Sequence, residues 1–82
     1  MEIRYEIVEQ IAPLEKPSKG WQLVLNRVSW NGNEPKYDIR PWNEDRTKCG
    51  KGITLTDEQL KYLGEIIRFR LTGKEGLEGG EQ

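Results

Sequence analysis

Apolar and polar residues alternate along three segments in the first half of the chain, which is the period-two pattern of β-strands with two different faces. The first segment covers residues 2 to 9, where Ile3, Tyr5 and Ile7 are in phase, and it continues weakly toward Leu14. The second covers residues 21 to 30 and the third residues 36 to 42. The pattern therefore predicts three strands before any helix begins.

The second segment changes phase along its length. Trp21, Leu23 and Leu25 occupy odd positions, whereas the apolar residues at 28 and 30 occupy even positions. Because a shift of one residue moves side chains to the opposite face of a sheet, we expect a bulge or sharp twist near residues 26 and 27. The earlier odd phase favours a core position for Trp21.

Turn residues separate these segments. Asn31-Gly32-Asn33 predicts that residues 21 to 42 form an antiparallel hairpin. Pro41 has no N–H group, so the third strand is expected to end there or to lie at an edge. A polar loop over residues 43 to 48 and the glycines of Gly50-Lys51-Gly52 lead into a short fourth strand at residues 53 to 55.

A helix signal follows the fourth strand. Thr56 is the predicted N-cap, and Gln59 stands at the capping-box position three residues later. The helix is expected to end at Gly73. The sequence thus predicts an α+β fold of the order ββββα as one domain over residues 1–72, and a disordered tail over residues 73–82.

The helix is apolar around more of its circumference than one sheet face would cover. We expect one side to pack on the sheet and the remaining apolar residues to face a second copy of the helix, which predicts a homodimer. The residues expected at this dimer interface are Leu63, Ile66, Ile67 and Phe69.

Charge changes sign along the chain although the net charge is only −1. Residues 16 to 52 carry eight cations against four acidic residues, which gives +4, and the two ends are acidic. The positive charge therefore surrounds the third strand, where a nucleic-acid partner would need it.

The composition excludes several classes of site. With one cysteine, Cys49, and no histidine, the chain has no internal disulfide, no metal cluster and no nucleophile–base pair, so we expect no cofactor and no enzymatic activity. Neither a signal peptide nor a membrane span is recognisable, and a lone thiol fits a reducing cytoplasm. Cys49 is expected to be a free thiol of no special role, with redox sensitivity as the alternative.

One face of the third strand carries the charged and aromatic side chains best suited to bind a ligand. Lys36, Asp38, Arg40 and Trp42 share one side, so two cations and an indole could hold a phosphate backbone and a stacked base. Asp38 would repel a phosphate, and we expect it to orient Arg40 or a loop amide instead. The alternative is ordinary packing for the tryptophans and a solvated surface for the cations.

Gly50-Lys51-Gly52 is not a phosphate-binding loop, because a P-loop needs an earlier glycine at fixed spacing, a Ser or Thr after the lysine, and a following helix. Here a strand comes next. These glycines are expected to allow a tight turn that holds Lys51 beside the sheet.

Together the motifs resemble a known family. Asp38-Ile39-Arg40, a tryptophan shortly after, the loop over residues 50 to 55 and the capped helix with Glu58-Gln59 and Leu63 are similar to the transcriptional coactivator family of positive cofactor 4. The segments at residues 25 to 31 and 35 to 40 look closer still to its bacterial YdbC-like branch.

The resemblance implies a homodimer of strongly curved sheets joined through their helices, which binds single-stranded DNA or melted duplex with little sequence preference. It implies stacking roles for Trp42 and Trp30 and backbone contacts for Arg40 and Lys51, so the expected nucleic-acid-binding residues are Trp30, Lys36, Arg40, Trp42, Lys48 and Lys51. It also implies a bacterial, cytoplasmic, nucleoid-associated protein of transcription, replication or repair. Single-stranded RNA binding and a protein-interaction module of the transcription machinery remain the alternatives.

Overall fold

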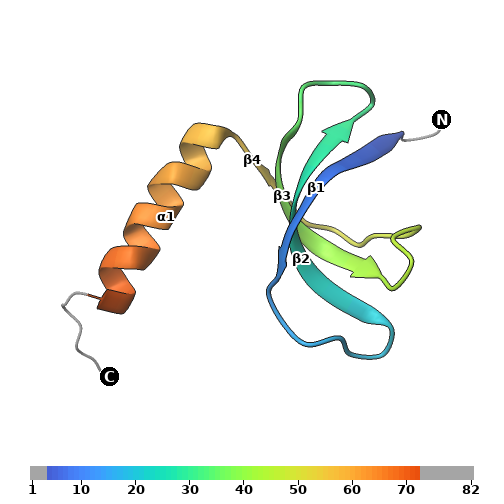
Figure 1. Cartoon of the computed structure of the whole chain (residues 1–82), viewed down its shortest axis with the longest axis horizontal. Coiled ribbons are helices and arrows are strands. Elements are labelled where there is room, and N and C mark those ends of the chain that lie inside the picture. The colour runs from blue at the N-terminus through green and yellow to red at the C-terminus, as the bar shows by residue number, and fades with distance from the viewer. Residues whose placement is uncertain (1–3, 73–82) are drawn as a thin grey trace.

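The computed structural model describes residues 4–72 and contains a curved antiparallel sheet followed by a helix (Figure 1). The strands lie in the order in which they follow along the chain. The predicted α+β fold is confirmed, whereas the predicted strand start at residue 2 and the tail at 73–82 lie outside the described residues. The elements are β1 (Tyr5–Pro13), β2 (Trp21–Trp30), β3 (Lys36–Asn43), β4 (Ile53–Leu55) and α1 (Asp57–Thr72).

The irregular pairing of the sheet belongs to β1 and not to β2. A bulge or sharp twist is predicted near residues 26 and 27 of β2, but β2 pairs with β3 without interruption from Trp21 to Val28, so β2 itself has no bulge there. The register shifts instead within β1, between residues 7 and 9 and between residues 10 and 12. The apolar phase of β2 changes because both of its faces are partly covered, with Val24 and Val28 buried on one face and Leu23 and Leu25 half-buried on the other.

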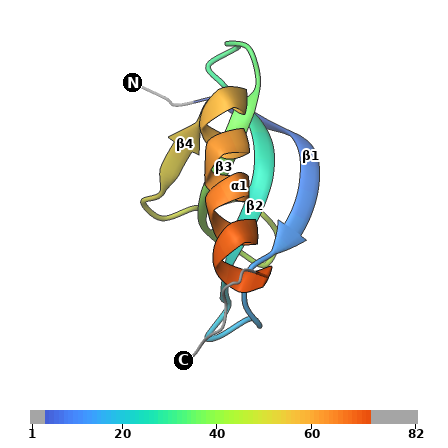
Figure 2. The same cartoon turned by 90° about the vertical axis from the view of Figure 1, so that its left-hand side faces the viewer.

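Bulges bend a strand and increase its twist, and β1 curves around the sheet as Figure 2 shows. Its Tyr5 ring lies 5.1 Å, centroid to centroid, from the ring of Trp42 on β3, although β2 separates the two strands. Such a contact requires that this face is concave. The concave face contains the buried residues Val24, Val28 and Trp42 together with the buried polar residues Asn26 and Asp38.

The β2–β3 hairpin is confirmed, and its turn has the expected backbone. Asn31 and Gly32 have φ angles of 54° and 77°. Asparagine and glycine tolerate this left-handed conformation, which matches the twist of the flanking strands. The turn therefore fixes the register that places Asn26 opposite Asp38.

Strand β3 does not end at Pro41 but continues to Asn43. The Pro41 carbonyl accepts a hydrogen bond of 2.9 Å from the Gly50 amide, so the proline nitrogen also faces the side of that loop. Strand β4 pairs only with residues 37 to 39, so no neighbouring strand needs an N–H group from Pro41. Because β3 is an inner strand that continues past Pro41, both predicted alternatives are wrong, and Pro41 is tolerated because no strand pairs with it on that side.

Helix α1 begins with the predicted capping box. The Gln59 amide donates to Thr56 Oγ1 at 3.0 Å, and the Thr56 amide donates to Gln59 Oε1 at 2.9 Å. The helix is described as far as Thr72, and its predicted end at Gly73 lies outside the described residues. An ion pair of 3.3 Å between Arg27 and Asp57 connects its first turn to β2.

The helix extends away from the sheet and does not pack along it (Figure 1). The prediction that one side of the helix packs on the sheet is therefore wrong for the single chain. No α1 residue is buried, and Phe69 is 75% exposed. Of the other residues predicted at a dimer interface, Ile66 and Ile67 are exposed and Leu63 is half-buried. In the part of the chain that the structure describes, no helix has both the length and the apolarity to span a membrane.

Candidate nucleic-acid interface

The carboxylate of Asp38 organises the concave face. It is fully buried and accepts two hydrogen bonds from Arg40, from Nε at 2.6 Å and from Nη2 at 2.9 Å. Trp30 Nε1 donates to it at 3.3 Å and Thr54 Oγ1 at 3.0 Å. The prediction that Asp38 orients Arg40 is confirmed, and the two-pronged contact fixes the plane of the guanidinium.

The guanidinium of Arg40 lies over the indole of Trp30, with 4.6 Å between its central carbon and the ring centroid. Burial lowers the pKa of Arg40, but the hydrogen bonds and the charge of Asp38 more than compensate, and the pKa is raised from its ordinary value. Arg40 is therefore a permanent cation held in one orientation.

Trp30 and Arg40 open onto a hollow of about 480 Å³ on the concave side of the molecule. We call it the Arg40 hollow, and its lining residues are Tyr5, Trp30, Arg40, Cys49, Gly50 and Lys51. Three of the six predicted nucleic-acid-binding residues, Trp30, Arg40 and Lys51, thus meet at one site. Proteins that bind single-stranded nucleic acid without sequence preference typically combine cations with aromatic rings in this way.

Lys51 reaches this hollow because its loop lies flat against β3. A Cβ atom on Gly52 would collide with Arg40 and with the carbonyl of Ile39, and one on Gly50 would come within 2.9 Å of Pro41. The prediction that these glycines hold Lys51 beside the sheet is therefore confirmed, but the tight turn predicted for them is wrong, because residues 50 to 52 form no turn. The reason is close approach to the strand, since neither glycine has a left-handed backbone.

Trp42 does not present its ring at the surface as expected. Its side chain is fully buried, with the Tyr5 ring at 5.1 Å and the nearly parallel Trp30 ring at 6.4 Å. The curled β1 brings Tyr5 over it, so an open stacking face at Trp42 is wrong for this structure. Trp21, expected in the core, is instead 40% exposed.

The structure does not bring Lys36 and Lys48 to the Arg40 hollow. Both are exposed, Lys36 at the start of β3 and Lys48 in the loop beside Cys49. Their predicted contact with a phosphate backbone stays a prediction.

Two residues at the site were not found from the sequence. Tyr5 lines the Arg40 hollow because β1 pairs it with Trp30, and Thr54 reaches Asp38 because β4 pairs the two. The alternation along the first strand predicted on which face Tyr5 lies, but not which residue of the neighbouring strand it pairs with. The missing information was the register between β1 and β2. Among residues 4–72, no three carboxylate, thiol or imidazole groups gather where they could hold a metal ion.

Comparison with known proteins agrees with this geometry. The family model described as Transcriptional Coactivator p15 (PC4) matches residues 17–66, which include β2, β3, β4 and the first part of α1. An uncharacterized protein of Treponema pallidum (strain Nichols) is 39% identical over 66 residues, which cover 80% of this chain and 78% of that protein. A bacterial relative is consistent with the bacterial branch that the motifs resemble. The chain belongs to the Transcriptional Coactivator p15 (PC4) family.

Proposed function

We propose that this chain binds single-stranded DNA with little sequence preference, in a role connected with transcription or with DNA replication and repair. The observation that carries the proposal is the Arg40 hollow, where a fixed guanidinium, a lysine and aromatic rings line one concave site. Its family membership supports a transcription-related role. The place of action would be the nucleoid of a bacterial cytoplasm.

The division of labour within the hollow follows from its contacts. Asp38 neutralises part of the charge of Arg40 and fixes its direction, so Arg40 would contribute oriented hydrogen bonds to a phosphate. Lys51 has a flexible stem and would contribute charge. Trp30 is half-buried with Arg40 over its ring, and it would contribute the part of its surface that remains open to contact with a base. None of these roles needs a reacting group, and the proposed activity is binding and not catalysis.

The proposed functional unit is a homodimer joined through α1. The helix leaves an apolar surface uncovered, with Ile66 61%, Phe69 75% and Leu71 77% exposed. An exposed apolar surface of this kind, on a helix with no buried residue, is typical of an interface between copies. Pairing would place two Arg40 hollows in one particle.

Salt dependence tests the proposed DNA binding. We expect quenching of tryptophan fluorescence by oligothymidine, with an affinity that falls linearly on a log-log plot by about 0.7 per neutralised phosphate. Lys51→Ala should weaken binding and reduce this slope by about 0.7, because one phosphate contact is lost. Lys61→Ala, which removes the same charge from exposed α1, is the matched control and should leave the slope unchanged.

The same titration distinguishes the partners. Single-stranded DNA should bind more tightly than duplex DNA or RNA of matched sequence. Tighter binding of RNA would show that the ligand is RNA and not DNA. An affinity that does not depend on the salt concentration would contradict the proposed phosphate contacts.

The dimer proposal has its own test. Phe69→Glu places a charge in the centre of the exposed apolar surface, so sedimentation equilibrium should show a dimer for the natural chain and a monomer for the variant. Lys61→Glu, a charge change on the same helix, should remain dimeric. A monomeric natural chain would refute the proposal, and a dimeric Phe69→Glu variant would place the interface elsewhere.

A further inference from the structure

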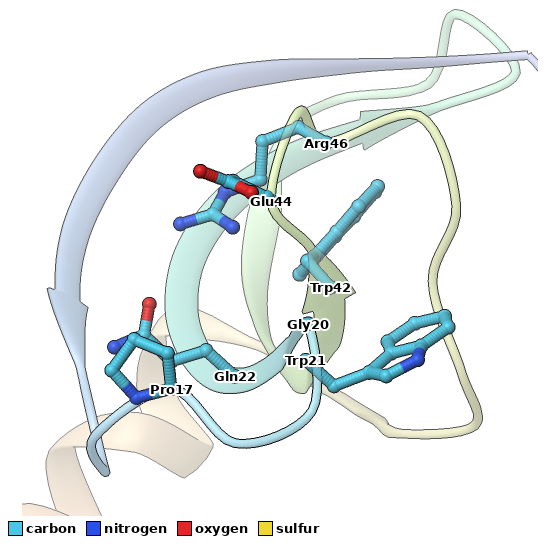
Figure 3. A pocket seen from close by; sticks show the side chains of 7 residues that line it. All are labelled: Pro17, Gly20, Trp21, Gln22, Trp42, Glu44 and Arg46. Carbon is cyan, nitrogen blue, oxygen red and sulfur yellow. The ribbon is translucent and has the colours of Figure 1, made fainter.

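A second hollow is lined in part by Trp42 and shares no lining residue with the Arg40 hollow. It has a volume of about 360 Å³, and we call it the Trp21 hollow. Figure 3 shows Pro17 and Trp21 from the chain around the start of β2, Trp42 from β3, and Glu44 and Arg46 from the loop that follows β3. Its walls thus combine two indoles with one carboxylate and one guanidinium.

Two buried donors at this hollow have no acceptor among residues 4–72. They are Trp42 Nε1, on a fully buried side chain, and Arg46 Nε. A buried donor without an acceptor is costly, so both groups favour a ligand that supplies acceptor atoms. Neither donor is used by the Arg40 hollow.

Arg46 is held firmly in place. Its Nη1 donates to the Asn43 carbonyl at 2.9 Å, and its own carbonyl accepts from the Tyr5 hydroxyl at 2.7 Å. Its φ of 62° is a left-handed conformation that a residue with a side chain seldom adopts. These contacts fix the guanidinium beside the hollow before any ligand arrives.

Glu44 lines the same hollow and supplies hydrogen-bond acceptors, whereas Arg46 supplies donors. Its side chain is exposed and makes no ion pair with Arg46 in the described part of the chain, although both line the hollow. A carboxylate only accepts hydrogen bonds and a guanidinium only donates them. The ligand edge must therefore present donors next to acceptors, and the exposed Trp21 indole provides a face for a flat ring.

We propose that the Trp21 hollow is a subsite for one guanine base of the bound single strand, an inference that rests on the proposed DNA binding. Guanine carries the donors N1–H and N2–H side by side, which match the two oxygens of Glu44. Its neighbouring acceptors O6 and N7 match Arg46, the commonest specific contact to this base. Trp21 would stack on the ring.

The other bases match less well. Thymine flanks a single N–H with two carbonyl groups, which Glu44 would repel. Adenine has an amino group but no carbonyl, and cytosine offers one amino donor to the carboxylate. The order expected from these edges is guanine, then cytosine, then adenine, with thymine last.

The position of the hollow fits a strand that first crosses the Arg40 hollow. Trp30 lines the Arg40 hollow, Trp42 lines the Trp21 hollow, and their ring centroids lie 6.4 Å apart. The packed rings of Trp30 and Trp42 thus connect the two hollows. A sequence-tolerant groove would let the strand slide until a guanine reaches the second site.

Competition binding tests the proposal with an oligothymidine in which one central thymine is replaced by guanine, cytosine or adenine. We expect the guanine oligomer to bind roughly fivefold to tenfold more tightly than oligothymidine, the low end of what a good two-pronged base contact provides. Glu44→Gln should remove this preference and leave the affinity for oligothymidine within about twofold, because the charge of one exposed residue contributes little to it. Glu34→Gln makes the same charge change in the exposed segment after the β2–β3 turn and should keep the preference.

The outcomes separate this inference from the proposed function. Equal affinity for all four oligomers, or a preference that survives Glu44→Gln, would overturn the guanine subsite while DNA binding stands. Failure of every oligomer to bind would reject both. Free deoxyguanosine monophosphate is expected to compete only weakly, and competition as strong as that of the oligomer would overturn the assignment to a base within a strand.

Discussion

Asp38→Ala is expected to destabilise the fold by about 3 kcal/mol, the lower end of the loss when one partner of a buried ion pair is removed. The carboxylate is fully buried and accepts four hydrogen bonds, two from Arg40 and one each from Trp30 and Thr54. Its loss leaves these donors without an acceptor, although Arg40 remains 17% exposed and can recover some hydration. The total free energy of unfolding of a small domain is roughly 5–15 kcal/mol, so the variant should be only marginally stable.

Chemical denaturation measures this loss, and Asp57→Ala is the matched control. Asp57 also pairs with an arginine, but its side chain is 75% exposed, so its removal should cost less than about 1 kcal/mol. DNA affinity of the folded Asp38→Ala protein should fall as well, because Arg40 is no longer oriented. Equal unfolding midpoints for the two variants would show that Asp38 does not organise the concave face.

Trp42→Ala is expected to cost about 3–5 kcal/mol, as for other large buried aromatic residues replaced by alanine. Tyr5 and Trp30 pack against its ring, and both would lose this contact. The result reverses the role expected from the family pattern, in which this tryptophan stacks a base. Loss of stability should therefore precede any loss of affinity.

Thermal unfolding of the natural chain, Trp42→Ala and Trp21→Ala provides the comparison. Trp21 is 40% exposed, so its replacement should cost clearly less than that of Trp42. A Trp42→Ala protein that keeps its stability but no longer binds DNA would restore the stacking role and contradict the packing described above.

Much of the fold was predictable because local signals agree with it. The Asn31–Gly32 turn, the Thr56 capping box and the shared face of Asp38 and Arg40 depend on neighbours in sequence, and each is confirmed. The curl of β1 was not predictable. It depends on register shifts against β2, and a single sequence does not reveal which residues pair across two strands.

That missing register explains the errors about the tryptophans. Strand phase correctly placed Trp42 on the side of Arg40, but only the curl of β1 decides that Tyr5 covers it. Trp21 was expected in the core because it is in phase with Leu23, yet the face on which it lies is open in this chain. Phase identifies a face, whereas packing decides whether that face is covered.

The sequential order of the strands has a consequence for how the chain folds. Every ladder joins strands that are neighbours in the chain, so each pairing closes a short loop and the entropy lost at each step is small. The sheet can grow outward from the β2–β3 hairpin, one strand at a time, which favours fast folding for a β-rich domain. Helix α1 has no buried residue and contributes little to this process, so the sheet should assemble without it.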